Sequence, residues 1–233
     1  LANADLRVYE MALEEPTADF TQGPAMSEED CARAMSYGML AVDEGFDVMA
    51  VGEMGIGNTT SAAALCCALI GGEPRDWVGR GTGVDDAGLA RKVEVIEAGL
   101  AANRAVLGDP LQVLRCLGGL ELAAVAGAVL AARIARLPVL LDGFACTAAA
   151  AVLYAADPRA LEHCLVAHRS VEPGHARLLA EIGQKPLLDL DMRLGEASGA
   201  VLAINLLKAA CACHNGMATF AEAGVSGAEG GEA

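Results

Sequence analysis

The chain has 233 residues, of which 54% are hydrophobic and 20% charged, a composition that argues against disorder and allows one main buried core. Acidic residues outnumber basic ones 31 to 16 without any lysine- and arginine-rich run, so nucleic acid is not an expected partner. Abundant alanine and glycine with only 3% aromatic residues favour helices packed on a sheet over an all-β sandwich.

The cysteines and the apolar stretches bear on compartment, metals and membranes. Most of the eight cysteines lie in apolar stretches without the spacing of a disulfide scaffold, which predicts buried, reduced thiols. Cys211, Cys213 and His214 lack a second ligand pair with zinc spacing, so a packed helix end is favoured and neither a metal nor a cofactor is expected.

No membrane partner is expected, because the most apolar stretch, residues 122–132, is too short to span a bilayer. The polar, acidic start lacks the pattern of a secretory signal, which favours the cytoplasm. The first residue is Leu1 instead of Met, so we expect a processed or truncated piece of a longer protein.

The first elements along the chain are an irregular segment, a helix, a strand and a glycine-rich loop. Residues 1–26 are mixed and contain two prolines, and Ser27 then begins a helix that should run to residue 43. The apolar run 47–52 is typical of a buried strand, and it leads into the loop 53–60, whose sequence is Glu-Met-Gly-Ile-Gly-Asn-Thr-Thr. An alanine-rich helix follows, to about residue 70.

A second glycine loop, residues 79–83, precedes a helix whose start, Asp85–Asp86, suits the positive end of a helix dipole. Another helix is predicted over 119–134. The order strand, loop and helix then recurs three times. The predicted segments are a strand at 138–143 with a helix at 147–155, a strand at 164–168 with a loop at 169–174 and a helix from His175 to about 183, and a strand at 186–190 with a helix at 196–212.

This alternation predicts the α/β class, with a parallel sheet covered by helices on both faces in a Rossmann-like three-layer arrangement. Ligands of such folds bind outside the carboxyl ends of the strands, where the four loops would meet. Residues 27–212 would form the large domain, preceded by the irregular segment 1–26 and followed by a tail, 213–233.

The loop after the first strand has two interpretations. Its glycines at 52, 55 and 57 do not have the dinucleotide spacing, and no Gly-Lys-Ser/Thr follows as in a P-loop. A strand, a glycine turn and a helix start can still form an anion cradle. The alternative is a plain tight turn with Asn58 or Thr59 as the helix cap.

Several side chains near the predicted strand ends are candidates for chemistry. Glu53 and Asp142 directly follow strands, where they would either bind a ligand or lie in solvent. Lys92 would supply charge for a phosphate or be solvated, and Glu196 would act at the site or only stabilise a helix start. His175 is a base or a structural residue, whereas His163 and His168 are expected to be packing residues.

Five segments resemble, in order and spacing, the motifs of the nicotinate-nucleotide:dimethylbenzimidazole phosphoribosyltransferase family. They are Gly52–Thr60, Gly79–Gly83, Leu141–Phe144, Ser170–His175 and Met192–Glu196. The resemblance covers nearly the whole chain, while family members carry roughly another third on the amino-terminal side. It implies a homodimer whose sites are completed across the interface, and it assigns the tail to part of a small helical domain.

The resemblance also implies a reaction and its residues. Phosphoribose passes from nicotinate mononucleotide to 5,6-dimethylbenzimidazole, giving α-ribazole 5′-phosphate and nicotinate in the synthesis of the lower ligand of cobalamin. Glu196 matches the general base. The residues that match the substrate site are Glu53, Gly55, Gly81, Lys92, Asp142, Gly143, Ser170 and Leu194.

Within this set, the glycine loops, Lys92 and Ser170 suit the phosphate, whereas Asp142 and Glu53 suit polar groups of the ribose or base. Ala145 and Ala197 depart from the family pattern, where a small hydroxyl residue and a glycine are expected. Two other functions remain as alternatives. One is a truncated or inactive nucleotide-binding homologue that serves as a binding module, and the other is a nicotinamide-dependent oxidoreductase, which the misplaced glycines disfavour.

Overall fold

The computed structural model describes residues 2–43, 45–81 and 83–225, and its centre is a parallel sheet. Strands β1 (Met49–Val51), β2 (Val139–Leu141) and β3 (Cys164–Val166) are neighbours in that order, and β4 (His168–Ser170) pairs in parallel with β5 (Leu188–Met192). Only Ala167 separates β3 from β4; its N–H donates to Leu141 O and its carbonyl accepts from Leu188 N, at 2.8 and 3.0 Å. The two sheets therefore continue one another at this residue.

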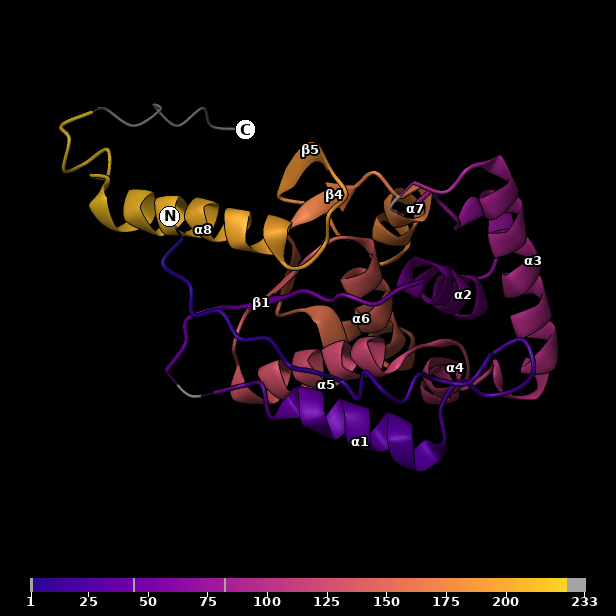
Figure 1. The fold of residues 1–233 in the computed structure, drawn as a ribbon. Coiled ribbons are helices and arrows are strands. Elements are labelled where there is room, and N and C mark those ends of the chain that lie inside the picture. Colours follow the sequence, from indigo (N-terminus) through magenta and orange to yellow (C-terminus); the bar gives the residue numbers. More distant parts are fainter. Residues whose placement is uncertain (1, 44, 82, 226–233) are drawn as a thin grey trace, which may run out of the picture.

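Eight α-helices are described in these residues. They are α1 (Glu28–Met39), α2 (Asn58–Ile70), α3 (Asp86–Ala102), α4 (Pro110–Leu117), α5 (Leu120–Ala135), α6 (Phe144–Ala156), α7 (Pro173–Glu181) and α8 (Ser198–Gly216). In Figure 1, α5 and α6 lie on one side of the strands and α8 on the other. The predicted α/β class with helices on both faces of a parallel sheet is confirmed.

Alternation along the strands explains these layers. Side chains point to opposite faces at successive strand positions, so Val139 and Leu141 enter the main core with α2, α5 and α6. Leu140 points the other way and packs with Ala200 and Ala203 of α8. One apolar run thus supplies two cores, and the smaller core fixes the start of α8 on the sheet.

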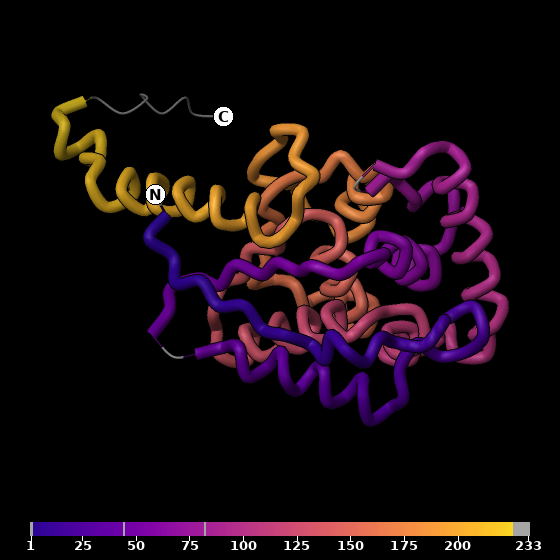
Figure 2. The backbone as a smooth tube through the Cα atoms, viewed as in Figure 1, coloured from indigo at the N-terminus to yellow at the C-terminus, as the bar shows by residue number. Residues whose placement is uncertain are grey.

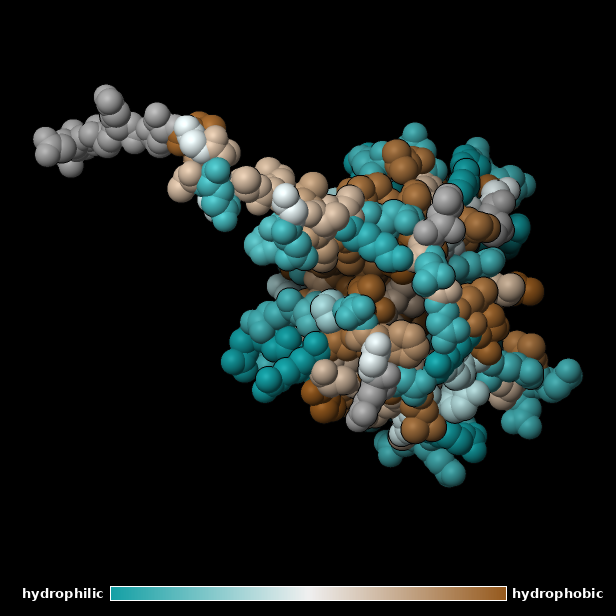
Figure 3. Space-filling model, turned by 90° about the vertical axis from the view of Figure 1, so that its left-hand side faces the viewer, coloured by the Kyte–Doolittle hydropathy of each residue, from teal (hydrophilic) through white to brown (hydrophobic). Residues whose placement is uncertain are grey.

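The outer half of α8 leaves the body of the molecule. All residues from Lys208 to Gly216 are exposed, and the space-filling view shows apolar side chains in the hollow beside the helix (Figure 3). Cys211 and Cys213 are among the exposed residues. The prediction that they belong to a packed helix end is wrong, because α8 continues beyond the sheet that buries its first turns; the other six cysteines are buried as predicted.

The amino-terminal segment crosses the molecule without a helix or strand in its described part, as predicted for 1–26 (Figure 2). It begins beside α8, where Lys208 Nζ donates to Ala2 O. It ends at α4, where Ala25 N donates to Cys116 O at 3.0 Å. The segment therefore connects α8 with α4 at the other end of the molecule.

Some predicted boundaries differ from the structure. The third strand continues past residue 168, since β4 includes Ser170, and α7 begins at Pro173 instead of His175. Helix α4 was not predicted, although its start carries an ordinary signal: Asp109 caps it through Leu111 N at 2.9 Å, and Pro110 takes the first position. Residues 226–233 of the expected tail lie outside the described residues.

Helices α1 and α5 pack with their backbones close together. A Cβ atom at Gly127 would lie 2.0 Å from Met35 O, and one at Gly38 would lie 1.9 Å from Ala124 O. Each glycine faces backbone of the other helix, which cannot move aside as a side chain can. Close approach of the two helices therefore requires glycine at these positions.

We expect Gly127→Ala to lower the free energy of unfolding by about 1–3 kcal/mol, the usual range for overpacking, because the clash exceeds the gain of about 1 kcal/mol in helix propensity. Urea unfolding would measure it. Gly108→Ala is the control, since nothing lies within 4 Å of its Cβ position. Equal stability of Gly127→Ala and the wild type would contradict the packing described.

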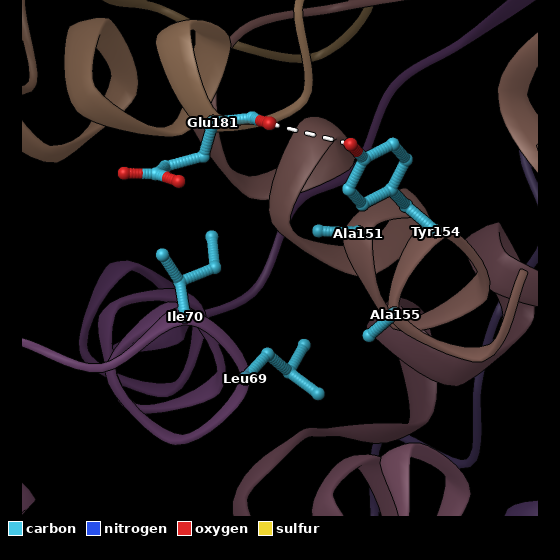
Figure 4. A pocket seen from close by; sticks show the side chains of 6 residues that line it. All are labelled: Leu69, Ile70, Ala151, Tyr154, Ala155 and Glu181. Carbon is cyan, nitrogen blue, oxygen red and sulfur yellow. Dashed lines mark hydrogen bonds between the residues drawn. The ribbon is translucent and has the colours of Figure 1, made fainter. Parts of the chain in front are cut away.

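The structure has a small cavity far from the loops that follow the strands. It measures about 310 Å³ and is lined by Leu69, Ile70, Ala151, Tyr154, Ala155 and Glu181, with Tyr154 Oη donating to Glu181 O at 3.3 Å (Figure 4). These residues lie in the last turns of α2, α6 and α7. Since the helices begin where the strands end, the cavity belongs to the edge of the sheet opposite the candidate site.

Candidate functional site

The loop after β1 touches the segment that carries Glu196. A Cβ atom at Gly52 would lie 2.1 Å from Ala197 N and 2.6 Å from Glu196 C, so the two backbones are in direct contact. Gly195, Glu196 and Ala197 have φ values of 80°, 58° and 61°, a left-handed conformation that is unfavourable for the last two. This tight turn places Glu196, which is exposed, at the carboxyl end of β1.

Asp142 holds the start of α8 from the end of β2. Its Oδ1 atom accepts hydrogen bonds from Gly199 N and Ala200 N, both at 2.9 Å, and the residue is only 1% exposed. The carboxylate thus satisfies two free amides at the helix start and meets the positive end of the dipole. Because Glu196 lies just before α8, Asp142 also fixes where Glu196 stands.

His168 supports this carboxylate. Its Nε2 atom lies 3.4 Å from Asp142 Oδ1, and both side chains are buried. Burial lowers the pKa of His168, but the hydrogen bond and the charge of Asp142 outweigh it, so the net shift of the pKa is upward. The packing role predicted for His168 is confirmed by its full burial.

His175 forms a second buried network. Its Nδ1 atom accepts from Ser170 N at 2.9 Å, so the proton resides on Nε2, which lies 3.2 Å from Thr147 Oγ1. Thr147 Oγ1 donates in turn to Gly143 O at 2.8 Å. Burial, aided by the charge of His168, lowers the pKa of His175 to about 3. These contacts favour the structural interpretation of His175, which links the predicted site residues Ser170 and Gly143.

A cationic group lies at the first turn of α2. Lys92 Nζ donates to Thr59 Oγ1 at 2.9 Å and to Gly79 O at 3.0 Å, and Gly81 is so near that its Cβ would lie 3.3 Å from Nζ. A helix start next to an ammonium group is an arrangement that suits phosphate, although Asn58 N and Thr60 N here already donate to Gly55 O and Gly57 O. Lys92 is half-buried, which favours the phosphate role over a solvated lysine.

The second glycine loop also forms hydrogen bonds with two other side chains, those of Glu172 and Arg193. Gly81 N donates to Glu172 Oε1 at 2.8 Å, and Arg193 Nη2 donates to Gly81 O at 2.9 Å. Arg193 precedes Leu194, so this contact joins the Lys92 region to the segment of Glu196. Thr82, in the same motif, lies outside the described residues.

Glu53 is the carboxylate whose titration the site changes most. Asn58 Nδ2 donates to Glu53 Oε2, and a Cβ at Gly195 would lie 3.6 Å from Oε1. Burial and then the charges of Glu121, Asp142 and Glu196 raise the pKa of Glu53 to about 7. Near neutral pH the Glu53 carboxyl group is therefore only partly ionised.

Glu121 was not predicted from the sequence. It lies at the start of α5, and its Oε1 atom is 3.0 Å from the Cβ position of Gly55. Burial raises the pKa of Glu121. The signal available was an acid two residues after the pair Gly118–Gly119, but only the fold brings it next to the first glycine loop.

We expect the Glu53 carboxyl group to contribute a fall in the free energy of unfolding as pH rises from about 5 to 8, and Glu53→Gln to remove this contribution. The folded state keeps the Glu53 proton up to about pH 7, while an unfolded chain releases it near 4.5. More protons are then bound in the folded state within this window, so raising pH favours unfolding, by on the order of 2–3 kcal/mol for this group. Urea unfolding at several pH values would measure the difference between variant and wild type. The exposed Glu97→Gln is the control, and parallel pH profiles of Glu53→Gln and wild type would refute the assignment.

Exposed apolar side chains stand beside these carboxylates. Met54 and Ile56 project from the first glycine loop and Leu194 from the segment before Glu196, with Leu194 68% exposed. Apolar surface next to a few polar groups is typical of small-molecule sites and suits a flat aromatic ring. Leu194, which was predicted as a site residue, is exposed and lies two residues before Glu196 in the chain.

The predicted site residues fall into two groups at the same edge of the sheet. Glu53, Asp142, Leu194 and Glu196 surround the turn before α8, and Gly81 and Lys92 lie at the start of α2. Arg193 connects the two groups through its hydrogen bond to Gly81 O, and Gly55 lies next to Glu121. Gly143 lies just after β2, and Ser170 is the last residue of β4. The arrangement is that of an α/β protein in which a lysine and a helix start lie next to carboxylates at the carboxyl ends of the strands.

Comparisons with known proteins identify the family. A family model described as phosphoribosyltransferase matches residues 1–225. The nicotinate-nucleotide–dimethylbenzimidazole phosphoribosyltransferase of Ruegeria sp. (strain TM1040) is 62% identical over 97% of the chain and 67% of its own length. That of Brucella canis is 56% identical over 95% of the chain and 65% of its own length. The chain belongs to the nicotinate-nucleotide–dimethylbenzimidazole phosphoribosyltransferase family.

A solved structure supports the fold. The crystal structure of CobT from Thermus thermophilus has a TM-score of 0.85 and 48% identity, over 90% of this chain and 64% of that one. The chain therefore spans about two thirds of the length of its relatives. These names support a transferase over a binding module.

Two further findings concern the described residues only. No group of three or more His, Cys, Asp or Glu side chains is arranged there to hold a metal ion. None of their helices is both long and apolar enough to cross a membrane.

Proposed function

We propose that the protein transfers phosphoribose from nicotinate mononucleotide to 5,6-dimethylbenzimidazole, giving α-ribazole 5′-phosphate and nicotinate for the lower ligand of cobalamin. One observation carries the proposal. Gly52 lies against the backbone of Glu196, while Arg193 of the same segment bonds Gly81 of the Lys92 group. These two contacts support a single site that combines a base with an anion cradle, as the family's reaction requires.

The reaction needs only one proton transfer at the attacking ring. The pyridine nitrogen of nicotinate mononucleotide is positively charged and leaves as a neutral ring nitrogen, so no acid has to protonate it. One benzimidazole nitrogen attacks the anomeric carbon while the other must lose its proton. We assign Glu196 as the general base that takes this proton, a role that contributes about 10²- to 10⁴-fold in typical enzymes.

The remaining side chains bind and orient the substrates. Lys92 and the start of α2 suit the phosphate, while Gly81 N, which donates to Glu172, helps to hold the loop beside them. Glu53 suits a hydroxyl of the ribose or a ring N–H. Leu194 would pack on the benzimidazole ring. Holding the two rings on opposite faces of the ribose lowers the barrier further by fixing the attack geometry.

The direct test is an assay of nicotinate release by the purified protein with nicotinate mononucleotide and dimethylbenzimidazole, with α-ribazole 5′-phosphate identified by mass spectrometry. Appearance of both products supports the proposal. Nucleotide binding without turnover, in a preparation whose longer relatives are active in the same assay, would favour the binding module.

We further propose that the protein acts as a homodimer in the cytoplasm, as the family resemblance implies. Light scattering during gel filtration would measure the assembly state, and a monomeric mass in an active preparation would refute the dimer.

A further inference from the structure

Glu172 is a buried carboxylate that the proposed reaction does not use. It lies between β4 and α7 and is 7% exposed. Its Oε1 atom accepts the hydrogen bond from Gly81 N at 2.8 Å, whereas Oε2 is buried without a hydrogen-bond partner among the described residues. Burying a carboxylate that is only partly satisfied is unfavourable, so the position calls for a physical reason.

The second glycine loop lies directly on this carboxylate. A Cβ atom at Gly79 would lie 2.2 Å from Glu172 Oε2 and 2.7 Å from Pro173 Cδ, so only glycine allows the contact. The carbonyl of Gly79 in turn accepts from Lys92 Nζ at 3.0 Å. Glu172 thus contacts the short backbone segment that holds the ammonium group.

The groups facing Lys92 come from three elements. Thr59 of α2 and Gly79 O of the loop accept its hydrogen bonds, and Glu172, before α7, is the charged group that acts on it. Arg193 contacts the same loop through Gly81 O. Burial lowers the pKa of Lys92, and the charge of Glu172 opposes this change.

We propose that Glu172 is a positioning residue for the phosphate of the nucleotide: it fixes the Gly79–Gly81 backbone and, through its charge, keeps the Lys92 ammonium protonated. This inference rests on the proposed function, because Lys92 is the phosphate ligand there. Two effects of Glu172 are separable. Its hydrogen bond to Gly81 needs an acceptor oxygen, which glutamine also has, whereas the stabilisation of protonated Lys92 needs the negative charge.

The test is the pH profile of kcat/KM for nicotinate mononucleotide in Glu172→Gln, with Glu181→Gln as the matched control on the exposed end of α7. At pH 7 Glu181→Gln should remain close to the wild type. The alkaline limb, where Lys92 loses its proton, should move to lower pH in Glu172→Gln, so kcat/KM within that limb should be lower than in the wild type and in Glu181→Gln. An unchanged limb in Glu172→Gln would overturn the charge role, as would an equal shift in Glu181→Gln.

Two further variants separate action through Lys92 from a general structural effect. Lys92→Met should weaken the nucleotide and abolish the alkaline limb, so adding Glu172→Gln to it should produce no further pH shift. Glu172→Asp keeps the charge but shortens the side chain; its limb should stay near that of the wild type while the KM for the nucleotide rises about tenfold or more through the lost bond to Gly81. A wild-type KM in Glu172→Asp would overturn the loop role.

Circular dichroism first confirms that each variant is folded. If one variant does not fold, the others still test the proposal, because Glu172→Asp and Lys92→Met are measured independently of each other. Failure of the proposed function is recognised first and independently, since the wild type would then release no nicotinate. With an active wild type, the variants test Glu172 alone.

Discussion

Replacing Glu196 by glutamine should lower kcat by about 10²- to 10⁴-fold and leave the affinity for nicotinate mononucleotide near that of the wild type. The amide has nearly the shape of the carboxylate but cannot take the proton from dimethylbenzimidazole. Glu196 is exposed, and its backbone is fixed by Gly52 and by the cap that Asp142 forms on α8, so the substitution should not disturb the fold. Steady-state kinetics of nicotinate release, with nucleotide binding followed by calorimetry, measure both quantities.

Asp191→Asn is the matched control for this variant. Asp191 also has a positive φ, 54°, and is exposed five residues before Glu196, so the same change of charge is made outside the proposed machinery. It should retain wild-type kcat. Turnover at the wild-type rate in Glu196→Gln would reject the assignment of the general base, and a large loss of nucleotide affinity would point to a binding role instead.

The fold was predictable because its signals are local. Strands β1, β2 and β3 are short apolar runs, and a loop and a helix start follow β1, β2, β4 and β5 along the chain. In the second strand, Leu140 between Val139 and Leu141 faces α8, so a continuous apolar run marks a strand buried on both faces. The edge at which Glu53, Lys92 and Glu196 gather also followed from parallel order, which places successive strand ends together.

The contacts that orient the site were not predictable from the sequence. Asp142 caps a helix start 57 and 58 residues further along the chain, and Glu172 binds Gly81 across 91 residues. Neither pair has a sequence signal, since a cap is normally sought within a few residues of its helix. The sequence therefore indicated Asp142 as a ligand of the substrate, whereas Oδ1 contacts α8; its role toward the ribose stays a prediction.

Gly52→Ala is expected to reduce kcat by about 100-fold through displacement of Glu196, although residue 52 carries no chemistry. The added Cβ would lie 2.1 Å from Ala197 N and 2.6 Å from Glu196 C, and both are backbone atoms of a turn that already holds two non-glycine residues at positive φ. The turn can relieve the contact only by moving, and a shift of roughly 1 Å in a catalytic group costs about 10²-fold in rate. Overpacking should also lower the free energy of unfolding by about 1–3 kcal/mol.

Kinetics and urea unfolding of Gly52→Ala distinguish this displacement from plain instability. At low temperature, where the variant is folded, kcat should remain reduced while the KM for nicotinate mononucleotide changes less, because Lys92 and Gly81 lie in the other group of the site. Gly23→Ala is the control, since nothing lies within 4 Å of its Cβ position. Wild-type kcat in folded Gly52→Ala would show that Glu196 need not be held by this contact. Wild-type kcat would also contradict the proposed geometry, which depends on the contact between Gly52, after β1, and the backbone of Glu196.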